Sequence, residues 1–344
     1  MSDSLKITAI RPERAIPGGE IEILVEGLQL DPSGRLLCFA NGLNCKIIGA
    51  SSKRVIATVP ACDDSSAVVQ LETELGESNG FVLTLGKLRA DEMHIVANPA
   101  IDPSDDALIL TRSGSRGQAL PHTLYRLETE GFLDELPVEI MNPTSIAFGP
   151  GGSMYVTNRA DGTVARIERG ERAVVVASDL GIATGLAFDR NGQMYVGDRS
   201  GTVYRVSEEG RASEFAKVEP SVAAFHMAFG PDERLFVTSP GFASHDAVYA
   251  IDGDGGVETW ARGLGRPQGL AFDREGDLYV AACFGGRHGI VRIDPDSRQI
   301  EHFLAGASVV GLCFTRNGEM VVATNDSVFS MNLGIYGTLL SDGS

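Results

Sequence analysis

Residues 184–196 read TGLAFDRNGQMYV, and residues 268–280 read QGLAFDREGDLYV. Both stretches contain an apolar run ending in Phe-Asp, a turn with Asn-Gly or Glu-Gly, and a second apolar run ending in Tyr-Val. Four more copies follow the pattern, with anchors 40 to 47 positions apart: Ile101, Phe148, Phe188, Phe229, Phe272 and Phe314. A repeat of this length, built of short strands and hairpin turns, is typical of a β-propeller with one four-stranded sheet per repeat. Six repeats predict a six-bladed β-propeller over residues 88–344.

Residues 1–87 lack this repeat and alternate short strands with turn-forming segments. Seven strands are expected there: 6–10, 21–26, 36–39, 46–50, 55–59, 68–72 and 80–85. Their number and spacing are typical of an immunoglobulin-like sandwich. The expected fold is therefore all-β, with an N-terminal immunoglobulin-like domain over residues 1–87 before the propeller. Because no Pro-, Gly- or Ser-rich linker separates the two domains, we expect them to be docked.

The two parts resemble known families. Residues 1–87 resemble the IPT/TIG family through Ile10-Arg-Pro12, Pro17-Gly-Gly19 and Val55-Ile-Ala-Thr-Val-Pro60. This resemblance implies an interaction or spacer domain with no chemistry of its own. The repeats resemble NHL-repeat propellers and, more loosely, the regucalcin and gluconolactonase superfamily. Because propellers host both enzymes and scaffolds, the second resemblance implies a fold more strongly than a function.

Charge and cysteine content limit the partners and the compartment. The formal net charge is −17, which repels nucleic-acid phosphates and anionic lipid. No apolar run is long enough to span a membrane, and no basic-then-apolar leader precedes the first strand. The cysteines form an odd set without metal-type Cys-x-x-Cys spacing: Cys38, Cys45, Cys62, Cys283 and Cys313. We therefore expect a cytoplasmic protein that binds neither nucleic acid nor membrane.

The expected ligand face is the one where loops enter the first strand of each blade, around the mouth of the central channel. Three positions before the anchors the chain carries Asn98, Ser145, Gly185, His226, Gly269 and Gly311, and Gln268 stands one position earlier in its repeat. The gluconolactonase resemblance implies a divalent metal held by Glu, Asn and Asp, but this column contains no carboxylate. One channel histidine is also too few for zinc. No cofactor is therefore predicted, and a divalent metal is kept only as an alternative.

Three loops expected on this face are long, and each is followed by a histidine. The loops 112–121, 239–244 and 282–287 precede His122, His245 and His288. These histidines could be solvated loop residues, or could act as general acids and bases near neutral pH. Cys283, at the start of the third loop, could be an inert buried thiol or a nucleophile beside a histidine.

These patterns predict a non-catalytic binding or scaffold propeller that recognises a protein, peptide or small-molecule ligand at its channel face. The expected binding residues are Asn98, His122, Ser145, His226, Gln268 and Cys283, with no metal ligands. The alternative is a gluconolactonase-like hydrolase or lyase with an atypical site, whose candidate catalytic residues are His226, His245 and His288. In either case, segment 91–96 is expected to supply the outer strand of the last blade and so close the ring.

The cysteine pattern generates a first prediction. Thiol titration of the denatured protein without prior reduction should find five reactive thiols, because an odd set with no leader favours unpaired cysteines. A titre of three or one would show that disulfides form.

Overall fold

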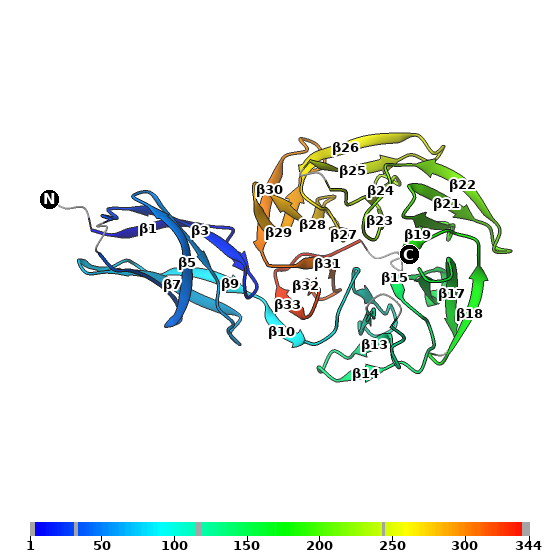
Figure 1. Ribbon diagram of the computed structural model, residues 1–344, viewed down its shortest axis with the longest axis horizontal. Coiled ribbons are helices and arrows are strands. Elements are labelled where there is room, and N and C mark those ends of the chain that lie inside the picture. Colours follow the sequence, from blue (N-terminus) through cyan, green and yellow to red (C-terminus); the bar gives the residue numbers. More distant parts are fainter. Residues whose placement is uncertain (1–3, 31–33, 115–117, 169, 243–244, 339–344) are drawn as a thin grey trace.

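The computed structural model describes residues 4–30, 34–114, 118–168, 170–242 and 245–338. The fold is an all-β propeller whose sheets are arranged in a ring, with the N-terminal strands lying beside that ring (Figure 1). In the described residues the single helical element is a 3-10 turn at Pro150–Gly152. None of the described residues forms a helix long and apolar enough to cross a membrane.

Five four-stranded antiparallel sheets of the ring stand alone. They contain β11 (Ala100–Ile101), β12 (Leu108–Thr111), β13 (Leu124–Leu127) and β14 (Leu133–Glu135); β15 (Pro143–Phe148), β16 (Met154–Asn158), β17 (Thr163–Glu168) and β18 (Arg172–Ala177); β19 (Ala183–Phe188), β20 (Met194–Asp198), β21 (Thr202–Val206) and β22 (Ala212–Lys217); β23 (His226–Phe229), β24 (Leu235–Thr238), β25 (Asp246–Ile251) and β26 (Val257–Leu264); and β31 (Val309–Phe314), β32 (Glu319–Thr324), β33 (Val328–Asn332) and β10 (Lys87–Ala90). The turn after the anchor Phe188 is fixed locally: the Asp189 carboxylate accepts the backbone N–H groups of Asn191 and Gln193, and Gly192 has a φ of 82°.

The predicted count of six separate blades differs from the observed pairing. Strands β27 (Leu270–Phe272), β28 (Leu278–Phe284), β29 (Arg287–Ile293) and β30 (Ile300–Ala305) pair in the same order as the other repeats, but they belong to a 13-stranded sheet. The reason is the short strand β2 (Arg14–Ala15), which pairs in parallel with both β30 and β9 (Phe81–Leu85) and so joins this repeat to the N-terminal strands. Five sheets are therefore separate, and the repeat with anchor Phe272 is not.

The other N-terminal strands surround a core of their own. In pairing order they are β1 (Lys6–Arg11), β3 (Glu20–Glu26), β6 (Arg54–Thr58), β5 (Leu43–Ser51), β4 (Leu36–Ala40), β7 (Ser66–Thr73) and β9, with β8 (Gly76–Glu77) paired to β7. Alternate residues of β3 point inward, so that Ile21 and Ile23 are fully buried. Cys38 and Cys45 are also buried in this core, and all five cysteines are unpaired.

The strand that closes the ring lies earlier in the chain than predicted. The outer strand beside β33 is β10, not segment 91–96. Glu92 and His94 have positive φ angles, 58° and 50°, which interrupt an extended strand. Segment 91–96 nevertheless stays packed, because the N–H groups of Met93 and Ile95 donate to Asp326 and Asn325 carbonyls at 2.9 and 3.0 Å.

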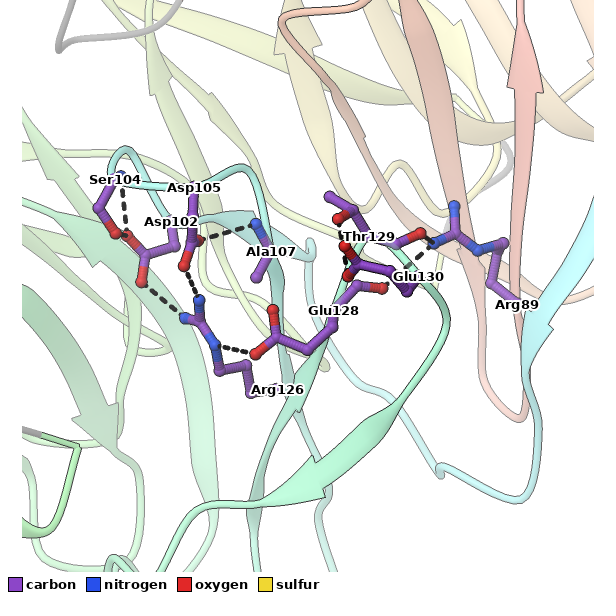
Figure 2. Close-up of polar contacts among 9 residues, drawn as sticks. All are labelled: Arg89, Asp102, Ser104, Asp105, Ala107, Arg126, Glu128, Thr129 and Glu130. Carbon is purple, nitrogen blue, oxygen red and sulfur yellow. Dashed lines mark hydrogen bonds and ion pairs between the residues drawn. The ribbon is translucent and has the colours of Figure 1, made fainter.

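Arg89 connects this closing strand with the first repeat, and Arg126 forms ion pairs within that repeat (Figure 2). Arg89 of β10 donates to the carbonyl of Thr129 at 3.1 Å. Arg126 of β13 pairs with Asp102 at 2.7 Å, with Glu128 at 2.6 Å and also with Asp105. Burial raises the pKa of Asp102, but hydrogen bonds from Ser104 and Arg126 outweigh it, and the net shift is downward. The ion pairs therefore hold the 102–105 turn against β13.

The N-terminal strands are docked on the propeller, as the short connection predicts. The N–H of Ile16 donates to the Ala305 carbonyl at 2.9 Å, and the Ile16 side chain is fully buried in the same cluster as Tyr279 and Phe303. Arg287 of β29 pairs with Glu22 of β3 at 3.1 Å. Burial raises the pKa of Glu22, yet the arginines around it lower the pKa further than burial raises it.

Replacement of Ile16 tests how much this contact contributes to the free energy of unfolding. Ile16→Ala should lower the free energy of unfolding by about 2–5 kcal/mol, because it leaves a cavity in a packed cluster. Ile48→Ala is the matched control, since Ile48 is 49% exposed, and it should change stability by less than about 0.5 kcal/mol. Urea unfolding measures both values. Equal, small losses would mean that the docking contact contributes little.

Candidate functional site

A cavity of about 430 Å³ lies where the N-terminal strands meet the propeller. Gly18 and Glu20 form its wall on the N-terminal side. The β28–β29 hairpin, the segment around Arg266 and the turn that follows β30 form the propeller side. Its volume falls in the usual range for small-molecule sites, roughly 300–1,000 Å³.

Three residues predicted from the sequence line this cavity: Gln268, Cys283 and His288. Gln268 lies just before β27, where its N–H donates to the Ala281 carbonyl at 2.8 Å. Cys283 is half-buried and His288 is exposed. The cavity thus brings together one amide, one thiol and one imidazole from a single repeat.

The hairpin that carries Cys283 and His288 is more ordered than the predicted loop 282–287. Strand β28 continues to Phe284 and β29 begins at Arg287, so only two residues form the turn. These are Gly285 and Gly286, with φ angles of 57° and 82°. Two positive φ angles in a two-residue turn suit the right-handed twist of a hairpin. Cys283 and His288 therefore lie in strands, which is a correction to their expected loop position.

Cys283 and His288 face each other directly across this hairpin. The N–H and carbonyl of Cys283 bond to Gly265, at 2.8 and 2.7 Å, so they point away from β29. Cys283 and His288 consequently form a non-hydrogen-bonded pair, the type in which opposite side chains approach most closely. The thiol and the imidazole lie on one face of the hairpin.

Asn98 and Ser145 are occupied by contacts between neighbouring sheets and do not line the cavity. Asn98 donates to the Leu270 carbonyl at 2.9 Å and accepts the Leu312 N–H at 3.1 Å. The Ser145 hydroxyl donates to the Thr184 carbonyl at 2.6 Å. The packing around Asn98 is tight, since a Cβ built on Gly269 would lie 1.9 Å from the Asn98 side-chain oxygen.

The remaining histidines are dispersed. His226 lies in β23 and is only 2% exposed, so it is an interior residue and not a rim residue as expected. Its Nε2 atom has no hydrogen-bond partner among the described residues, and burial lowers its pKa to about 4. His245 is exposed, and His122 lies 3.2 Å from the Glu135 carboxylate. Parts of the two loops before these residues, 115–117 and 243–244, lie outside the described residues.

The catalytic candidates therefore do not form one site, since of His226, His245 and His288 only His288 lines the cavity. Among the side chains that the structure describes, no group of three or more His, Cys, Asp or Glu residues could hold a metal ion.

His302, next to the cavity, is a residue that the sequence analysis does not identify. It lies in β30, and neither ring nitrogen has a hydrogen-bond partner in the described residues. Burial lowers its pKa to about 4; the backbone of His288 acts in the opposite direction, and the positive charge of Arg287 acts in the same direction as burial. In the sequence it is one residue of an outer strand, and only its burial in the folded chain distinguishes it.

No family model and no curated protein matches this sequence. Solved structures nevertheless share its fold at low sequence identity. A gluconolactonase from Xanthomonas campestris is 16% identical over 72% of this chain and 89% of its own, with a TM-score of 0.58. A catalytically inactive virginiamycin B lyase from Staphylococcus aureus is 15% identical over 88% of this chain and 100% of its own, with a TM-score of 0.53.

An auxiliary nutrient binding protein from Bacteroides ovatus is 12% identical, with a TM-score of 0.54. Its alignment covers 98% of this chain and 99% of its own, so it includes the N-terminal strands. These similarities establish the β-propeller fold.

The two buried neutral histidines generate a prediction for pH dependence. A histidine whose pKa falls from 6.5 to about 4 on folding binds more protons in the unfolded state than in the folded state. The stability of the fold is therefore unaffected by this histidine above pH 6.5 and decreases as the pH falls toward 4. In urea unfolding at pH 7 and pH 4.5, the wild type should lose about 2 kcal/mol more than His302→Leu. His245→Leu, at an exposed histidine, should behave as the wild type. An equal acid loss in His302→Leu and the wild type would contradict the assignment.

Proposed function

We propose that this protein is a non-catalytic binding protein that captures a small polar ligand in the cavity between its N-terminal strands and its propeller. The observation that carries the proposal is the composition of the cavity wall. Glu20 comes from the N-terminal strands, whereas Arg266 and His288 come from the propeller. A ligand in this position would contact both parts of the chain at once.

The wall chemistry favours a small molecule over a peptide or a protein. Its polar side chains provide both charge signs and neutral hydrogen-bonding groups: Glu20, Arg266, Gln268, His288, Ser308 and Asn325. Stable protein interfaces bury about 800 Å² on each partner, which is far more surface than this cavity provides. The expected ligand therefore has several hydrogen-bonding groups and a carboxylate that can pair with Arg266.

The organisation of the chain belongs to the same proposal. Residues 1–87 would be an immunoglobulin-like domain of the IPT/TIG type, and residues 88–344 an NHL-like propeller in which β27–β30 serve as the sixth blade. The strand order of β27–β30, which matches the five separate sheets, supports this assignment. The unpaired thiols and the net charge of −17 support a cytoplasmic protein without nucleic-acid or membrane partners.

The binding role agrees better with the site than the gluconolactonase-like alternative does. The nutrient-binding protein from Bacteroides ovatus aligns over nearly the whole chain, whereas the gluconolactonase aligns over about three quarters of it. A hydrolase or lyase would need more chemistry than the single histidine that lines the cavity. We therefore treat the cavity as a binding site.

A blocked cavity tests the proposal. A panel of amino acids, sugars and organic acids would be screened by thermal shift, and hits confirmed by calorimetry. A ligand of the cavity should raise the Tm of the wild type but not of Asn325→Trp, whose new indole occupies the space. Asn191→Trp is the matched control, because Asn191 is an exposed asparagine in a turn outside the cavity. A ligand that binds Asn325→Trp as tightly as the control would place the site elsewhere.

A further inference from the structure

The cavity contains a pair of residues that simple ligand capture does not require. Cys283 and His288 both line it, at directly opposed positions of β28 and β29. The two-residue turn at Gly285 and Gly286 fixes this register. In a non-hydrogen-bonded pair the opposed Cβ atoms lie about 4.5–5.5 Å apart, so the thiol and the imidazole are side by side on one face of the hairpin.

The other thiols have different surroundings. Cys38 and Cys45 are 0% and 2% exposed, within the core of the N-terminal strands. Burial raises the pKa of Cys313. Cys62 is half-buried like Cys283, but its sulfur lies 3.4 Å from the Asp64 carboxylate. Among the five thiols, Cys283 alone lines the cavity and opposes a histidine.

The charged groups of the same wall indicate which reactant could approach this thiol. Arg266 offers a guanidinium for a carboxylate, and Glu20 offers a carboxylate for an ammonium group. A small disulfide derived from amino acids carries both groups and a sulfur that a thiolate can attack. A reactant of this class would match the polar groups and also meet the thiol.

We propose that Cys283 is a histidine-assisted thiol that forms a mixed disulfide with a small, amino-acid-derived disulfide bound in the cavity. His288 accepts the thiol proton, and the thiolate attacks one sulfur of the disulfide. The disulfide bond breaks, a bond forms between Cys283 and the attacked sulfur, and the other half leaves as a thiolate that takes the proton from His288. Cys283 is oxidised and the departing half is reduced, so electrons balance. A free thiol reverses the reaction.

The test compares a charged and a neutral disulfide on the full-length protein. Cystine carries the carboxylate and ammonium groups, and bis(2-hydroxyethyl) disulfide carries neither. Mass spectrometry of digested protein follows modification of Cys283 and, as an internal reference, of Cys62. Cys283 should react at least about tenfold faster than Cys62 with both probes.

Two variants separate the role of His288 from that of Arg266. His288→Gln should slow modification of Cys283 about tenfold at pH 7 with both probes, and should make the rate depend more steeply on pH. Arg266→Gln should slow the reaction with cystine but not with the neutral disulfide. Thermal unfolding of each variant, and alkylation of its Cys62, report whether the fold is retained.

Equal rates at Cys283 and Cys62, or an unchanged Cys283 rate in His288→Gln, would overturn the activated thiol. An equal effect of Arg266→Gln on both probes would overturn the proposed reactant class. The covalent reaction is read by mass spectrometry at Cys283, whereas ligand capture is read by thermal shift of the wild type and Asn325→Trp, so the two proposals can fail independently.

Discussion

An outer strand with an unpaired edge exposes a row of backbone N–H and carbonyl groups, and β30 would present such an edge on the outside of the ring. Ala15 of β2 pairs with Ala305 of β30, and Ile16 enters the apolar cluster beneath this contact. The Glu22 carboxylate adds a charged contact to Arg287. Pairing, burial and charge thus act at one place and fix the position of the N-terminal strands.

The cavity is a consequence of this docking. Gly18 and Glu20 follow β2 directly, so the contact that pairs Ala15 with Ala305 also carries them to the mouth of the β28–β29 hairpin. Close approach is feasible because Gly19 has no side chain, since a Cβ there would lie 2.4 Å from the Ala305 carbonyl oxygen.

Local sequence signals predicted much of the fold, because strand periodicity and turn residues act over short distances. They indicated the six anchors and the strand-rich N-terminal part. They could not show that Ala15 pairs with a strand 290 positions later, nor that His226 is interior, because both depend on tertiary contacts. Gly285-Gly286 has the same ambiguity, because two consecutive glycines occur both in tight hairpin turns and in longer loops.

The polar side chains near the predicted channel face are used to hold neighbouring sheets together. Asn98 uses its side chain to connect β27 and β31, and Ser145 connects its strand to β19. Side chains committed to holding neighbouring sheets together are not free to bind a ligand or a metal. Gly269 and Gly311 add no functional group, and their packing against Asn98 leaves little space. The proposed binding site therefore lies further out, at the repeat whose outer strand β30 pairs with β2 of the N-terminal strands.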